Sequence, residues 1–98
     1  GTPGTDQFMA GQTKATKGRR REAGREVLAM SPGYGFPERA VEENVRRLVR
    51  PLSAPADDVR KACEFNLSKG YCRTRWNEDT EEAEFLITKR GLAKQEVR

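Results

Sequence analysis

Apolar residues recur at helical spacing in three segments of the chain. The first predicted helix runs from about Thr16 or Lys17 to Met30, and it stops where Ser31 to Gly33 brings a proline and a glycine. A second helix is predicted over Glu38 to Val49, with charged residues on the side opposite its apolar face. The third runs from Pro55 to about Lys69, and Gly70 suits its C-terminal end.

The third helix is followed by a pattern typical of strands. Tyr71 to Trp76 alternates and predicts one strand, and Ala83 to Thr88 predicts a second that returns beside it. On the second strand, Phe85 and Ile87 share one face, while Glu84 and Leu86 share the other. A polar turn at Asn77–Glu82 is predicted to join the two strands. After the second strand we expect a turn at Lys89–Gly91 and then a short helix or frayed end at Leu92–Val97. Between the first two helices, Tyr34–Pro37 is predicted as an aromatic loop that folds back onto the core.

The order of these elements predicts an α+β fold made of one domain, with three helices followed by a β-hairpin. Hydrophobic residues make up 35% of the chain and charged residues 35%, which suits a small polar domain better than full disorder. Residues 1–15 are rich in Gly, Thr and Gln without a period, so we expect a flexible N-terminal tail. Residues 16–98 are expected to form the domain.

Positive charge is concentrated in the first half of the chain. Residues 1–50 hold ten Lys and Arg against six Asp and Glu, whereas residues 51–98 hold nine of each. Basic clusters of this kind favour a polyanionic partner. The densest cluster comprises Lys14, Lys17, Arg19, Arg20, Arg21 and Arg25.

Catalytic and metal-binding patterns are absent from the sequence. The chain has no His, which excludes Ser-His, Cys-His and His-metal sites. Cys63 and Cys72 are too few for a tetrahedral zinc site, and we interpret them as reduced thiols. The acidic stretch Glu78 to Glu84 lacks the ligand spacing of a calcium loop. We therefore expect no enzyme activity, no cofactor and no metal, and we interpret the single Trp76 as a cap on the hydrophobic core.

Membrane and secretion signals are also absent. No run of about 18 apolar residues occurs, and no charged start precedes an apolar segment at the N-terminus. We therefore expect a cytoplasmic protein without a membrane span.

Two short motifs resemble winged helix-turn-helix proteins. Leu67 to Tyr71 is similar to the exit of their recognition helix, with a leucine, two polar residues, a glycine and an apolar residue. Phe85 to Gly91 is similar to the end of their wing, with apolar residues, a threonine, basic residues and a glycine. With the three helical patterns, the resemblance covers about Lys17 to Glu96, and it extends to small winged-helix proteins of bacteria and their phages.

The resemblance implies a mode of DNA binding. The third helix would enter the major groove, with Arg60, Lys61 and Glu64 at its exposed positions, and the wing would touch the backbone or minor groove. Lysine and arginine neutralise phosphates, and arginine also reads guanine edges. The candidate DNA-binding residues are Lys14, Lys17, Arg19, Arg20, Arg21, Arg60, Lys61, Arg73 and Arg75.

Asn66 stands where such a helix usually presents an apolar core residue. Either Leu67 takes that place through a small rotation of the helix, or Asn66 is buried with a hydrogen-bond partner.

The sequence leaves more than one partner open. The leading hypothesis is binding of double-stranded DNA by a small transcriptional regulator or phage-related factor; the alternative is a winged-helix module that binds protein. A homodimer, in which the basic first half of one chain meets the acidic hairpin of another, is compatible with both. DNA binding predicts that Arg60, Lys61 and the arginines of the first helix form one positive face. Protein binding predicts an exposed apolar patch near Tyr34, Phe36 or Trp76.

Overall fold

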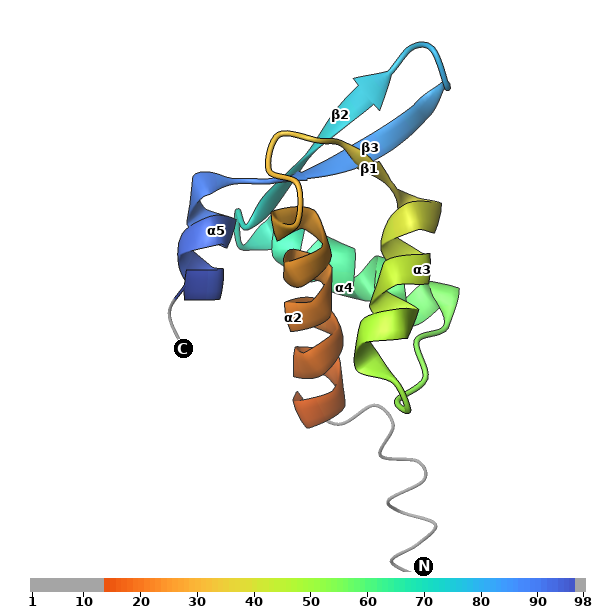
Figure 1. Ribbon diagram of the computed structural model, residues 1–98, viewed down its shortest axis with the longest axis vertical. Coiled ribbons are helices and arrows are strands. Elements are labelled where there is room, and N and C mark those ends of the chain that lie inside the picture. Colours follow the sequence, from red (N-terminus) through yellow and green to blue (C-terminus); the bar gives the residue numbers. More distant parts are fainter. Residues whose placement is uncertain (1–13, 97–98) are drawn as a thin grey trace, which may run out of the picture.

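The computed structural model describes residues 14–96, and within that range it is an α+β fold with four helices and three strands. Figure 1 shows three helices gathered below a hairpin, with a short helix at the C-terminal side. The α+β class predicted from the sequence is confirmed. The elements in chain order are α2 (Lys14–Ala29), β1 (Phe36–Pro37), α3 (Glu38–Val49), α4 (Ala56–Ser68), β2 (Cys72–Asn77), β3 (Glu82–Ile87) and α5 (Lys89–Glu96).

The three predicted main helices are present. The bounds of α3 agree with the prediction, and those of α4 differ by one residue at each end. Helix α2 begins at Lys14 rather than at Thr16 or Lys17, so Lys14 and Ala15 belong to the helix and not to the expected tail. The rest of that tail, residues 1–13, lies outside the described range.

The sheet contains one strand more than predicted. The three strands are antiparallel in the order β1-β3-β2. The predicted hairpin is confirmed, with Cys72 paired to Ile87 and Trp76 paired to Ala83. Strand β1 was expected to be loop, and only Phe36 and Pro37 form it, because Phe36 pairs with Phe85 on the far edge of β3. A two-residue strand has no alternation that a sequence pattern could reveal.

The prediction of a turn at Lys89–Gly91 is wrong, because α5 begins there. The Thr88 hydroxyl accepts a hydrogen bond from the Gly91 N–H at 3.0 Å, which is the usual N-terminal cap of a helix. The same hydroxyl donates to the Gly70 carbonyl at 2.6 Å. A Cβ at Gly91 would lie 2.0 Å from the Tyr71 carbonyl oxygen, so only glycine fits where α5 meets the chain before β2.

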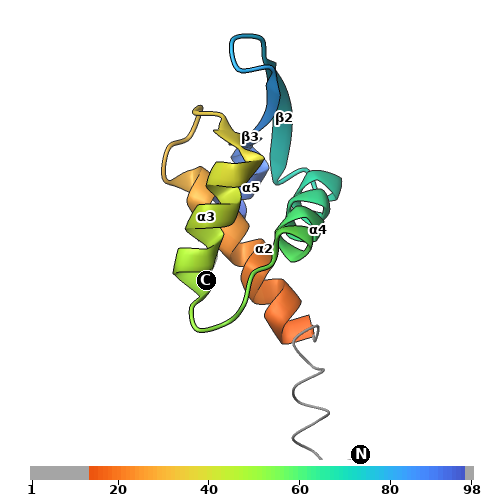
Figure 2. The ribbon, with the colours of Figure 1, turned by 90° about the vertical axis from the view of Figure 1, so that its right-hand side faces the viewer.

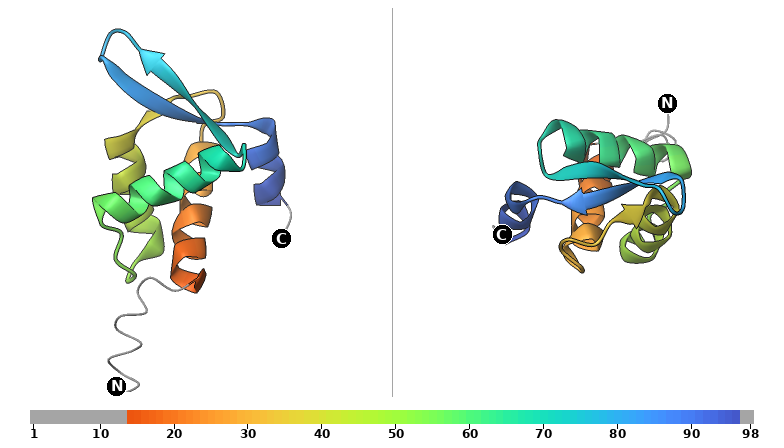
Figure 3. Two further views of the ribbon diagram at one scale, coloured as in Figure 1. Left: turned by 180° about the vertical axis from the view of Figure 1, so that it is seen from behind. Right: turned by 90° about the horizontal axis from the view of Figure 1, so that it is seen from above.

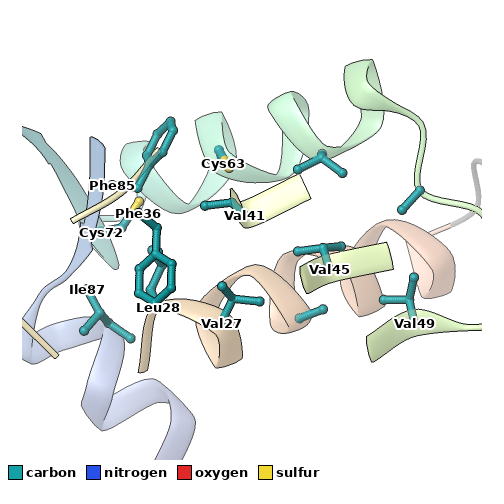
Figure 4. Close-up of a cluster of buried hydrophobic side chains, with 13 residues drawn as sticks. Val27, Leu28, Phe36, Val41, Val45, Val49, Cys63, Cys72, Phe85 and Ile87 are labelled. Carbon is teal, nitrogen blue, oxygen red and sulfur yellow. The ribbon is translucent and has the colours of Figure 1, made fainter. Parts of the chain in front are cut away.

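The hydrophobic core lies where α2, α3 and α4 meet one face of the sheet. Val27, Val41 and Val45 have no exposed surface, and Figure 4 shows their side chains converging with those of the neighbouring elements. Phe85 and Ile87 join this core as predicted, but Leu86 and Glu84 on the other face of β3 are buried as well. Strand β3 is the middle strand, so both of its edges are paired, and the side chains of Arg75 and Asn77 on β2 contact Glu84.

Trp76 does not cap the core. Its side chain is 60% exposed, which contradicts the prediction. It shares a sheet face with Cys72, since alternate residues of a strand point the same way, but it lies near the outer end of the hairpin. Figure 2 shows that end projecting beyond the helices, so no helix is available to cover the indole.

Candidate nucleic-acid interface

Seven arginines in the described part of the chain pair with nearby carboxylates. Arg46 and Arg47 each pair with a glutamate one turn earlier on α3, as the sequence order favours. Ion pairs of this kind leave little net charge at the surface. The other five pairs or groups are Arg19 with Glu22 and Glu26, Arg20 with Asp58, Arg39 with Glu82, Arg60 with Glu38 and Asp57, and Arg75 with Glu84.

A second set of cations has no such partners. Lys17 and Arg21 on α2 face α4, and they lie near Lys61 on α4 and Lys69 at its C-terminal cap. We call these four residues the α2–α4 edge. Within residues 14–96, no carboxylate forms an ion pair with any of them. Figure 3 (left) shows α4 crossing α2, which is the packing that brings these side chains together.

Between the two helices lies a small hollow of about 90 Å³. Its lining contains cations from both helices and one carboxylate, Asp58, whose side chain is 12% exposed. An excess of positive charge around a small hollow suits a phosphate-sized anion. The lining residues are Lys17, Arg20, Arg21, Asp58, Lys61 and Ala62.

Arg20 was predicted to contact DNA, but it is buried and lines the hollow from inside the protein. Its side chain is 2% exposed, its Nε donates to the Ser53 carbonyl at 3.0 Å, and its Nη2 lies 3.7 Å from Asp58 Oδ2. Buried charges persist where they have ionic and hydrogen-bond partners. Arg20 therefore holds α2 to the segment before α4, and it contributes to the potential of the hollow without reaching solvent.

Arg25, the last member of the basic cluster found in the sequence, is also buried. Its side chain is 8% exposed; its Nε donates to Gln95 Oε1 at 2.8 Å and its Nη1 to Asn66 Oδ1 at 3.1 Å. Burial lowers the pKa of Arg25, although its guanidinium stays charged at neutral pH. Asn66 in turn donates to the Arg21 carbonyl at 3.2 Å. The alternative in which Asn66 is buried with a hydrogen-bond partner is therefore confirmed.

Aromatic rings support the cations of the edge. The Arg21 guanidinium carbon lies 3.8 Å from the centre of the Phe65 ring, and Lys69 Nζ lies 5.7 Å from the same centre. Both distances fall within the range of cation–π attraction. Phe65 thus orients two cations without neutralising them. Neither Phe65 nor Lys69 was among the predicted site residues, although Phe65 follows Lys61 by four residues and so had to lie beside it on a helix.

The other predicted residues of α2 and α4 lie away from the edge. Arg19 turns towards α3, where its Nη2 donates to the Leu48 carbonyl at 3.1 Å. Arg60 lies 3.5 Å from Glu38 at the start of α3 and does not line the hollow. The expected continuous face therefore includes Lys61 but neither Arg60 nor Arg19.

The predicted residues of the hairpin have different surroundings. Arg73 is exposed, whereas Arg75 Nη2 lies 3.1 Å from Glu84 Oε1. Hydrogen bonds from Asn77 and then Arg75 hold the pKa of Glu84 below its usual range. Tyr34 is 58% exposed and Phe36 is buried, so Trp76 and Tyr34 are the exposed aromatics of the predicted apolar patch. The structure thus contains elements of both expected surfaces.

Cys63 and Cys72 are unbridged and buried, in agreement with the interpretation as thiols. Burial raises the pKa of Cys63 to about 12 and that of Cys72 to about 11. Thiols with such pKa values are poor nucleophiles at neutral pH. Residues 14–96 contain no group of three or more side chains placed to hold a metal ion. Over the same range, no helix has the length and apolar character needed to cross a membrane.

No family description, curated protein or solved structure matches this chain. The assignment of a function therefore depends on the geometry described above.

Proposed function

We propose that this chain is a winged-helix protein that binds double-stranded DNA through the α2–α4 edge. The order helix, strand, helix, helix, strand, strand and the sheet order β1-β3-β2 support a winged helix-turn-helix, with α3 and α4 as the two helices of the motif and β2–β3 as the wing. Such a protein would act as a small transcriptional regulator or phage-related DNA-binding factor. It would work in the cytoplasm of a bacterium, where the DNA lies.

The observation that carries the proposal is the contrast between paired and unpaired cations. The arginines of α3 all have carboxylate partners, those of Arg46 and Arg47 on the same helix and that of Arg39 on β3, while the cations of the α2–α4 edge have none among residues 14–96. Unpaired cations can exchange solvent and counterions for phosphates, which is the main source of affinity for DNA. The edge, which gathers four such cations from two helices, is therefore suited to a phosphate backbone.

The exposed surface of α4 gives little support for strong sequence readout. It carries Arg60 and Lys61 beside Asp57 and Glu64, and Arg60 already pairs with Glu38. The hairpin end adds further carboxylates, which phosphates would repel. We expect binding that depends on backbone contacts and varies little with DNA sequence.

The proposal is tested by titrating the whole chain into a fluorescent random duplex oligonucleotide at two salt concentrations. If all four cations of the edge meet phosphates, the slope of log K against log salt is roughly −3 to −4, and binding weakens roughly a hundredfold between about 50 and 200 mM salt. Absence of binding at the lower salt concentration would reject the proposal.

The alternative function, a winged helix that binds protein, is favoured by one observation. Trp76 is 60% exposed on a hairpin whose end carries exposed carboxylates, and exposed tryptophan is enriched in protein interfaces. A pull-down with the wild-type chain and with Trp76→Ala tests it. A protein that binds this surface should be captured by the wild type and not by the variant, which lacks the indole.

A further inference from the structure

The hairpin end carries a cluster of unpaired carboxylates. Glu78, Asp79 and Glu81 are exposed, and no Lys or Arg among residues 14–96 forms an ion pair with them. The carboxylates of β3 differ, because Glu82 pairs with Arg39 and Glu84 with Arg75. Glu64 on α4 and Glu96 on α5 are exposed without an ion pair too, but among residues 14–96 only the turn that joins β2 to β3 brings three such carboxylates together.

These carboxylates and the α2–α4 edge cannot neutralise each other within one molecule. Figure 2 shows the hairpin end and the start of α2 at opposite ends of the fold. The two surfaces carry opposite charge, and neither has an ion-pair partner among the described residues. A second copy is the partner whose chemistry matches both surfaces at once.

We propose that the hairpin end of one copy docks on the α2–α4 edge of another. Glu78 and Glu81 would face Lys17 and Lys61, and Trp76 beside them would bring a large apolar surface into the contact. A single contact joins two different surfaces, so it is heterologous and leaves one hairpin and one edge free to bind a further copy. We therefore expect association beyond a dimer, in open oligomers or in rings where the rotation closes.

The docking has two consequences for solution behaviour. Exposed charge pairs are screened by salt, so the association constant falls several-fold between about 50 and 200 mM salt. A duplex oligonucleotide that occupies the edge would compete with the hairpin and dissociate the oligomers. The docking itself does not require DNA binding, so it stands or falls independently of the proposed function.

A charge swap tests the docking. The hairpin variant carries Glu78→Lys and Glu81→Lys, and the edge variant carries Lys17→Glu and Lys61→Glu. Each variant alone has two surfaces of like charge and should remain monomeric in sedimentation velocity at low salt. An equimolar mixture again has complementary surfaces, so its average mass should rise with concentration as that of the wild type does.

A control variant and a spectroscopic measurement separate docking from nonspecific attraction. The Glu43 side chain on α3 is 75% exposed, so Glu43→Lys reverses a surface charge outside both docking surfaces and should leave self-association unchanged. Trp76 is the single tryptophan, so its emission should shift to shorter wavelength as the wild type associates. Far-UV circular dichroism verifies that each variant is folded.

Two results would overturn the docking: a wild-type chain that stays monomeric at about 1 mM and low salt, or a mixture of the two variants that associates no more than either alone. Measurement of DNA binding by the hairpin variant keeps the two proposals apart, because its α2–α4 edge is intact. If it binds DNA while the wild type fails to self-associate, only the docking is lost.

Discussion

Arg25→Met is the substitution that probes most directly how α2, α4 and α5 are held together. The methionine keeps much of the aliphatic volume but removes the guanidinium, which donates to Asn66 and Gln95. Asn66 is 1% exposed, so its Oδ1 would be left without a donor and without access to water. Gln95 is only partly buried, so water can replace its lost partner.

The cost follows from these contacts. A hydrogen bond to a charged group contributes about 1.5–3 kcal/mol, and a buried acceptor left unsatisfied costs about 1–3 kcal/mol, with overlap between the two. We expect Arg25→Met to lower the free energy of unfolding by about 2–3 kcal/mol. For a domain of this size, that corresponds to a fall in Tm of roughly 10–20 °C.

Urea and thermal unfolding followed by far-UV circular dichroism measure this change, because the exposed Trp76 is a weak reporter of core packing. Arg47→Met is the matched control: its guanidinium lies at the surface, 3.7 Å from Glu43, and its loss should cost less than about 0.5 kcal/mol. In the Arg25→Met background, Asn66→Leu removes the unsatisfied amide oxygen and loses only the hydrogen bond to the Arg21 carbonyl, so it should cost less than it does in the wild-type background. The reasoning is refuted if Arg25→Met costs no more than Arg47→Met, or if the costs of Arg25→Met and Asn66→Leu simply add.

Further predictions concern one glycine contact and the buried thiols. Gly91→Ala should destabilise the fold by about 3 kcal/mol or more, because the new Cβ would lie 2.0 Å from the Tyr71 carbonyl oxygen. Gly18→Ala, where nothing lies within 4 Å, should stabilise α2 by about 0.5–1 kcal/mol, and thermal unfolding of the pair compares the two. Burial raises the pKa of Cys63 to about 12 and of Cys72 to about 11 from an ordinary 9.0, so stability is fully present below pH 9 and is lost as the pH rises towards 11 and 12. At pH 10 each thiol should lower the free energy of unfolding by about 1.4 kcal/mol. In urea unfolding, a variant with both cysteines replaced by alanine should therefore lose less stability at alkaline pH than the wild type.

The helices and the hairpin could be predicted because their apolar residues follow regular periods. Strand β1 could not, since Phe36 becomes a strand residue only by pairing with Phe85. The start of α5 was missed for a different reason. Thr88 had the chemistry of a helix cap, but the following Lys-Arg-Gly is equally typical of a turn, and the deciding contacts come from Gly70 and Tyr71.

The candidate site was predicted only in part. Lys17, Arg21 and Lys61 are among the predicted DNA-binding residues, and the packing of α2 on α4 brings them together. That packing cannot be deduced from periodicity. The burial of Arg20 and Arg25 was missed because arginines on a helix are usually exposed, and only partners distant in sequence make their burial possible.

The role of the α2–α4 edge is tested most directly by the salt dependence of DNA binding in a double variant. Lys17→Met with Lys61→Met removes two unpaired cations, whereas Arg46→Met with Arg47→Met removes two that are paired on α3. Each lost phosphate contact changes the slope of log K against log salt by about 0.9. We predict that the first variant binds more weakly with a slope smaller by about 1.8, and that the second matches the wild type. An unchanged slope in the first variant, with DNA still bound, would contradict the assignment of the edge as the DNA-binding surface.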